Sequence, residues 1–184
     1  ITLAVADDPT DEEIDVTIAS TGGGGAYRRS ATKIVAASDS LDTANADYVC
    51  DGTADEAEIE VAINALPASG GRVLLMEGTY NISTPIDINK NRVTLEGQGW
   101  GTRLFLVNGA NCNVINIDDG TGVKSHVMIK NLYIDGNRAN QTATSRGIYR
   151  WGSAEANTVD DSVIENVYIK SARNGGIVVK YANR

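Results

Sequence analysis

The residues of this chain that could do chemistry are carboxylates and arginines in its second half. Two reactions suit such groups: proton abstraction beside a calcium ion held by clustered aspartates, and glycoside hydrolysis by two carboxylates about 5 to 9.5 Å apart. The best candidates are Asp135, Arg146, Arg150 and Glu165, because internal repeats place them on or beside neighbouring turns of the chain. The alternative is that they are ordinary solvated charges on a sheet face. Further carboxylates and bases are Asp118, Asp119, Glu155, Asp160 and Asp161, and Lys130, Arg138 and Arg173.

Aromatic residues near polar loops favour a second kind of site, one that binds sugars. The flat face of an aromatic ring suits a pyranose ring, and a few polar groups beside it fix the orientation. For Trp100, which lies in a Gly-Gln-Gly-Trp-Gly turn, the alternative is that the ring packs over the edge of its own turn. The predicted carbohydrate-binding residues are Trp100, Tyr133, Tyr149, Trp151 and Tyr168.

No metal or cofactor pattern is present in the sequence. Cys50 and Cys112 lie in no Cys-x-x-Cys or Cys/His spacing, so we predict no metal site, no cofactor and two free thiols, with calcium as the one ion left open. The only histidine, His126, is expected at the surface or at a corner. The glycine run at 22–25 lacks the Gly-Lys-Ser/Thr of a phosphate loop and is interpreted as a tether.

Length and charge limit the classes of protein that remain. The chain has 184 residues, a net charge of -8 and a sequence pI near 4.6. This acidity argues against a nucleic-acid binder, which would need a basic surface for phosphates. No apolar run approaches the length of a membrane span, so we expect no membrane partner.

The elements that must position these residues begin with one amphipathic helix, predicted from Asp55 to Leu66. Thr53 and Glu56 form a capping-box pattern at its start, and Pro67, Gly70 and Gly71 follow its end. One face carries the residues expected to be buried, Ile59, Ala62, Ile63 and Leu66, and the opposite face those expected to be exposed, Glu56, Glu58, Glu60 and Asn64.

Internal repeats then predict stacked strands. The segment 128–135 aligns with 163–170, asparagine on asparagine and tyrosine on tyrosine, and 146–149 aligns with 175–178. The segment 93–98 is aligned with 132–137 as an earlier turn. Stacked turns lie about 4.8 Å apart, so equivalent side chains form ladders. We therefore expect Tyr133 to stack on Tyr168, Asn131 and Asn166 to form an internal ladder, and Asp135 to form an exposed ion pair with Lys170.

The run DGTADEAEIEVAINALPASGGRVLLMEGTYNIS, followed by LEGQGWGTRL, resembles the opening segment of the pectate-lyase-like superfamily. The resemblance is close from Ala36 to Leu106 and continues as repeat character. It implies an all-β fold, a right-handed parallel β-helix with an N-terminal capping helix. The superfamily hosts lyases, hydrolases, epimerases and non-enzymatic fibres, so the resemblance specifies the fold and leaves the function open. In its longer members the catalytic residues usually lie on later turns, and we expect the β-helix to continue past Arg184.

The N-terminal segment, residues 1–30, is predicted to be a β-hairpin and a glycine-rich linker, ahead of a β-helix domain at 31–184. A hairpin and linker before a β-helix resemble the anchoring region of phage tail and head fibres. This resemblance implies a homotrimeric virion or extracellular protein that contacts other virion proteins through residues 1–30 and adheres to host polysaccharide. The alternative is a secreted polysaccharide lyase or glycoside hydrolase. The insertions 136–145 and 152–160 are expected to carry specificity.

Overall fold

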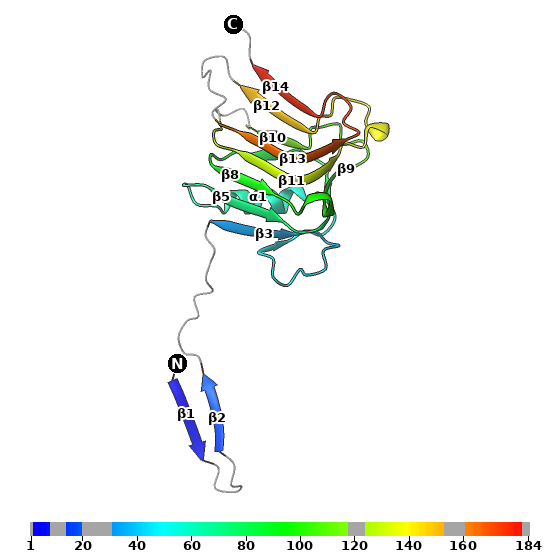
Figure 1. Ribbon diagram of the computed structural model, residues 1–184. Helices are drawn as coiled ribbons and strands as arrows, with labels where there is room; N and C mark the ends of the chain where they lie inside the picture. The colour runs from blue at the N-terminus through cyan, green and yellow to red at the C-terminus, as the bar shows by residue number, and fades with distance from the viewer. Residues whose placement is uncertain (1, 8–13, 20–30, 118–123, 153–160, 182–184) are drawn as a thin grey trace.

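The computed structural model describes residues 2–7, 14–19, 31–117, 124–152 and 161–181 (Figure 1). Near the N-terminus, β1 (Thr2–Asp7) pairs antiparallel with β2 (Ile14–Ala19). From β3 (Thr32–Ala36) onward, every strand pairing in the described ranges is parallel. No helix in these ranges has the length and apolar character needed to cross a membrane.

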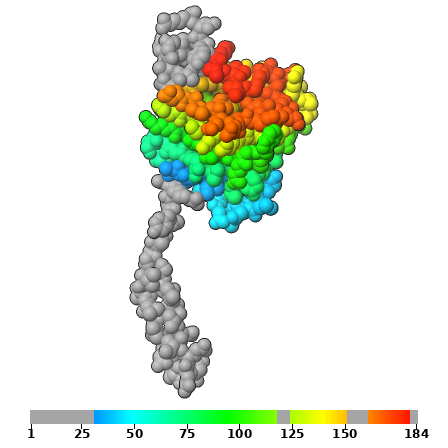
Figure 2. Space-filling model, in the orientation of Figure 1, coloured from blue at the N-terminus to red at the C-terminus, as the bar shows by residue number. Residues whose placement is uncertain are grey.

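Each turn of the chain adds strand segments that stack on the equivalent segments of the turn before. In the space-filling view the colours follow one another from cyan to red along the stack, so turns that are neighbours in sequence are neighbours in space (Figure 2). This is a parallel β-helix, as the sequence predicts. Its turns contain β5 (Gly71–Leu75), β6 (Gly78–Ile82) and β7 (Ile86–Ile88); β8 (Val93–Glu96), β9 (Thr102–Leu106) and β10 (Ile115–Ile117); β11 (Met128–Asp135) and β12 (Ile148–Gly152); and β13 (Val163–Lys170) and β14 (Ile177–Tyr181).

The core consists of apolar side chains that alternate along the strands and point into the stack. In β8 and β9, Val93, Leu95, Leu104 and Leu106 are completely buried, while the residues between them are half-buried. Each such side chain contributes about 1.5 to 3 kcal/mol by leaving water. Other members of this core are Val73, Leu75, Tyr80, Ile82, Ile86, Ile88, Ile115, Ile117, Ile129, Leu132, Ile134 and Ile148.

The helix α1 (Glu56–Asn64) packs against β3, β5, β6, β7 and the short strand β4 (Tyr48–Val49). Ile59, Ala62, Ile63 and Leu66 are buried as predicted, although the helix ends two residues before Leu66. The predicted capping box is wrong, because Asp55 occupies the N-cap position and its side chain caps no helical N–H.

Glu56 also differs from the prediction, since it is buried instead of exposed. Its carboxylate accepts hydrogen bonds from the backbone and hydroxyl groups of Ser83 and Thr84, at 2.6 to 3.1 Å. The helix is therefore fastened to the turn that follows β6, and the residue that sequence analysis assigned to a local cap makes a long-range contact.

The repeat alignment of the last two turns is confirmed residue by residue. Tyr133 pairs with Tyr168 between β11 and β13, and Ile148 with Ile177 between β12 and β14. The alignment of 93–98 with 132–137 is wrong, because Thr94 pairs with Met128 instead of Tyr133. The reason is an insertion at 97–101: β8 and β9 are separate strands, whereas in the next turn the single strand β11 pairs with both.

Candidate carbohydrate-binding site

Three of the predicted aromatic residues form a cluster on the outside of the β-helix. Tyr133 on β11 and Tyr168 on β13 lie on adjacent turns with ring centroids 5.4 Å apart, so the predicted tyrosine stack is confirmed. Trp100, on the 3-10 helix η1 (Gly99–Gly101), reaches across both, at 5.7 Å from Tyr133 and 4.3 Å from Tyr168. Trp100 is 70% exposed and Tyr168 is 44% exposed, so the cluster presents ring surface to solvent.

The insertion that carries Trp100 is fixed at its base. Thr102 is buried, and its hydroxyl accepts a hydrogen bond from the backbone N–H of Gln98 and donates one to the carbonyl of Met76. A side chain on Gly97 would lie 2.6 Å from the carbonyl oxygen of Asn131, so only glycine lets the two turns approach here. The strand ends therefore hold the insertion in place while Trp100 extends from its tip.

A pocket of about 150 Å³ lies beside the cluster. Its walls are the three rings, Leu132, Gly99 and the side chains of Asn131 and Asn166. A more open depression shares Trp100, Asn166 and Tyr168 and continues over the last turn. Together they give a concave surface with aromatic walls and two amide groups, which is the composition of a sugar-binding site.

Asn131 and Asn166 form the predicted ladder, but on the surface instead of inside the stack. Both residues have left-handed backbone conformations, with φ of 55° and 50°, and lie at the corner that the Trp100 insertion occupies in the turn before β11. Asn166 Nδ2 donates to Asn131 Oδ1 at 3.2 Å, and Asn131 Nδ2 donates to Glu96 Oε1 at 3.3 Å. The ladder thus joins three successive turns.

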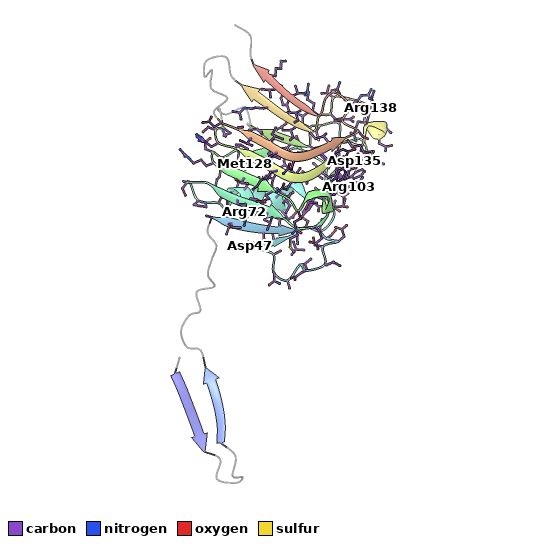
Figure 3. All side chains as sticks on the ribbon, in the orientation of Figure 1. Asp47, Arg72, Arg103, Met128, Asp135 and Arg138 are labelled. Atoms are coloured by element: carbon purple, nitrogen blue, oxygen red, sulfur yellow. The ribbon has the colours of Figure 1, made fainter. Side chains whose placement is uncertain are left out.

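Asp135 lies beside the cluster and is only 7% exposed, so the expectation of an exposed pair with Lys170 is wrong. Its carboxylate accepts hydrogen bonds from Arg103 at 2.7 Å, Tyr133 Oη at 3.3 Å and the Asn137 N–H at 3.1 Å. The Arg103 guanidinium lies 4.6 Å from the centre of the Phe105 ring, and Figure 3 shows Arg103 next to Asp135 at one end of the strands. Arg103 is not among the residues predicted from the sequence, because the misaligned turn hid its pairing with Tyr133.

The Asp135 carboxylate should make stability depend on pH. Burial alone would raise the pKa of Asp135, but the Asn137 N–H and the Arg103 guanidinium outweigh it and hold the pKa below its ordinary value. Its stabilising effect is therefore full above the unfolded pKa and is lost as pH falls through the folded pKa. We expect Asp135→Asn to lower the free energy of unfolding by about 1 to 2 kcal/mol at neutral pH and by much less near pH 2. Urea titrations of both proteins at the two pH values measure this difference, and an equal deficit at both would contradict it.

The four predicted catalytic residues each contact a different set of groups. Glu165 is an exposed residue of β13, opposite Lys130. Arg146 lies over the Tyr149 ring at 4.5 Å and donates to Asn113.

Arg150 is 4% exposed and occupies a core position on β12, since it pairs with Ile117. Its guanidinium donates to the Ser162 hydroxyl and to the Lys124 carbonyl. Arg150 therefore joins the segments that lead into β11 and β13 from a buried position, a role that strand periodicity alone did not indicate.

The other predicted residues lie elsewhere or outside the described part of the chain. Tyr149 is on β12, in a different sheet from the cluster. The side chain of Trp151 and all of Asp118, Asp119, Glu155 and Asp160 lie outside the described residues. Asp161 is exposed, and its Oδ2 atom lies 3.6 Å from Nε2 of the exposed His126. Hydrogen bonds hold the insertion at 136–145 against residues 107–111. The Gln141 side chain accepts a hydrogen bond from the Asn111 N–H and donates one to the Val107 carbonyl. Asn111 Oδ1 in turn accepts hydrogen bonds from the Thr142 and Ala143 N–H groups.

Both cysteines are free thiols, as predicted, with Cys50 buried and Cys112 half-buried. Burial raises the pKa of the Cys112 thiol to about 11 and raises the pKa of Cys50 further, so neither is a thiolate at neutral pH. In the described residues, the ligand atoms of Cys50, Asp55 and Glu58 lie within 4.8 Å of one another and could hold a metal ion. The Asp55 oxygens already accept hydrogen bonds from the Gly52 and Asn81 N–H groups.

Two solved structures are similar to this chain. The A-module of the mannuronan C-5 epimerase AlgE4 from Azotobacter vinelandii matches with a TM-score of 0.60 and 25% sequence identity, over 72% of this chain and 39% of that one. The A-module of AlgE6 from the same organism matches with a TM-score of 0.58 and 26% identity, over the same shares. Both are parallel β-helices, and this chain spans 39% of their length. No protein-family profile and no curated protein matches the sequence.

Proposed function

We propose that this chain is a structural and adhesion subunit of a phage tail or head fibre or spike, whose β-helix binds polysaccharide on the host surface. The observation that carries the proposal is the exposed cluster of Trp100, Tyr133 and Tyr168, with a pocket beside it. The similarity to epimerases named for a polysaccharide, mannuronan, supports the same class of ligand.

In this proposal the chain is a homotrimer in the virion or outside the cell. Residues 1–30 attach it to other virion proteins, and residues 31–184 begin a right-handed β-helical shaft. The helix α1 closes the first turn, because it lies against β3, β4, β5, β6 and β7. The hydrogen bonds along the stacked turns give such a shaft the stiffness that a fibre needs.

A single substitution tests the proposed site. Trp100→Ala removes the most exposed ring of the cluster, and we expect at least about a tenfold loss of affinity for the polysaccharide, since stacked rings carry much of the binding energy of such sites. The free energy of unfolding should change by less than about 1 kcal/mol, because the side chain is mostly in solvent. Calorimetric titration of host surface polysaccharide measures the affinity. Tyr149→Ala removes a ring from the other sheet and should leave it unchanged, and equal affinities for all three proteins would refute the site.

A second candidate function is modification of a polysaccharide by a lyase, hydrolase or epimerase activity. The observation that favours it is the similarity to mannuronan C-5 epimerase modules. Light scattering and product analysis separate the two functions. A trimer that binds polysaccharide and leaves it unchanged supports the fibre, whereas a monomer that cleaves or epimerises mannuronan supports the enzyme.

A further inference from the structure

The pocket beside Trp100 is lined by uncharged side chains. Its apolar walls are Trp100, Leu132, Tyr133 and Tyr168, and its polar groups are the amides of Asn131 and Asn166. A carboxylate placed against these walls would lose water without gaining a cationic partner, which costs free energy. A hydroxyl group would lose less, because amides pair well with hydroxyls.

Two cations on the strands around the pocket are already paired with carboxylates. Arg103, which pairs in register with Tyr133, lies 2.7 Å from Asp135, and Lys130, which precedes Asn131, lies 3.5 Å from Glu96. Lys170 is exposed and is not among the residues that line the pocket. The chain as a whole carries a net charge of -8, which repels a polyanion at low salt.

The asparagine ladder has a direction. Each amide donates toward Glu96, from Asn166 to Asn131 and from Asn131 to the carboxylate. Among the described residues, none donates a hydrogen bond to the Oδ1 atom of Asn166, which lies at the edge of the pocket. An amide oxygen in this position accepts from a hydroxyl group and repels a carboxylate.

We infer that this pocket takes a neutral hexose unit, with the sugar ring on Trp100 and Tyr168 and one of its hydroxyl groups donating to Asn166 Oδ1. The inference rests on the proposed polysaccharide binding and narrows its ligand class. It also separates this site from the acidic polymer for which the similar epimerases are named.

Two oligosaccharides that differ at one carbon test the ligand class. The β-1,4-linked mannose hexamer carries a hydroxymethyl group where the β-1,4-linked mannuronate hexamer carries a carboxylate. In calorimetric titrations of the full chain, we expect the neutral hexamer to bind at least about tenfold more tightly. Its dissociation constant should stay the same between about 50 and about 500 mM salt, because no charge pairing is involved. Tighter binding of mannuronate, or affinity for the neutral hexamer that falls steeply with salt, would overturn the inference.

Two substitutions of Asn166 test the contact. Asn166→Gly removes the amide at a left-handed position that glycine accepts without strain, and should weaken binding of the neutral hexamer about tenfold. Asn166→Asp keeps an oxygen acceptor, so it should retain the neutral hexamer and weaken mannuronate further. Unchanged affinity in Asn166→Gly would overturn the role of this residue. If the wild-type chain binds neither hexamer, the proposed binding at this site fails, whereas binding of mannuronate alone contradicts only the neutral ligand class.

Discussion

Glu56→Ala is expected to lower the free energy of unfolding by about 3 kcal/mol. Glu56 is 4% exposed, and its carboxylate accepts hydrogen bonds from the backbone N–H groups and the hydroxyl groups of Ser83 and Thr84. Burial alone would raise the pKa of Glu56, but these hydrogen bonds outweigh it and lower the pKa, so the carboxylate is charged and fully engaged at neutral pH. Its removal leaves polar groups near α1 without partners, except where water reaches the exposed Thr84.

The measurement is a urea titration at neutral pH, with Glu165→Ala as the matched control. Glu165 is an exposed glutamate on β13, and its removal should change the free energy of unfolding by less than about 0.5 kcal/mol. A loss in Glu56→Ala no larger than in the control would show that the contact between α1 and the turn after β6 contributes little. Because the folded pKa of Glu56 is lowered, the difference from the wild type should shrink as pH falls through the unfolded and then the folded pKa.

Gly70→Ala is expected to destabilise the protein by about 3 kcal/mol or more, since two costs combine. Gly70 has φ of +92°, a conformation that alanine adopts only with strain. An added Cβ would also lie 2.3 Å from the carbonyl oxygen of Arg92, and that oxygen accepts the hydrogen bond from the Gly71 N–H that joins two turns. The backbone at the start of β5 would have to move.

Gly109→Ala separates the two costs. Gly109 has a comparable φ of +73°, but an added Cβ there meets no atom within 4 Å. This variant should therefore lose only the conformational cost, about 1 kcal/mol. Thermal or urea unfolding of both variants measures the difference. Equal losses would show that the close approach of Gly70 to Arg92 is relieved without cost.

Much of the fold could be predicted from the sequence because the repeats are local and regular. Segments 128–135 and 163–170 have the same length and the same order of apolar residues, asparagine and tyrosine, so their register was predicted correctly. A side-chain period of two then places Tyr133 and Tyr168 outside and Ile134 inside. Stacking of equivalent positions follows from the spacing of strands, and needs no knowledge of distant contacts.

The predictions that were wrong concern contacts between turns of unequal length. The insertion at 97–101 changes the offset between paired residues from 34, for Thr94 and Met128, to 30, for Arg103 and Tyr133, which sequence similarity alone did not show. For the same reason the pairing of Arg103 with Asp135 was missed. Arg150 was predicted as a catalytic candidate, with a solvated charge as the alternative, yet it follows the inward positions of β12 and donates its hydrogen bonds to other segments.

By itself, the sequence determined the parallel β-helix, the helix near its start, the ladders of the last two turns and the acidic charge. Only the tertiary structure decided that Trp100 joins the two tyrosines, that the asparagine ladder lies at the edge of a pocket, and that Asp135 is buried against Arg103. The physical reason is that strand periodicity is a property of neighbouring residues, whereas the position of an inserted turn depends on which backbone of the next turn it can approach.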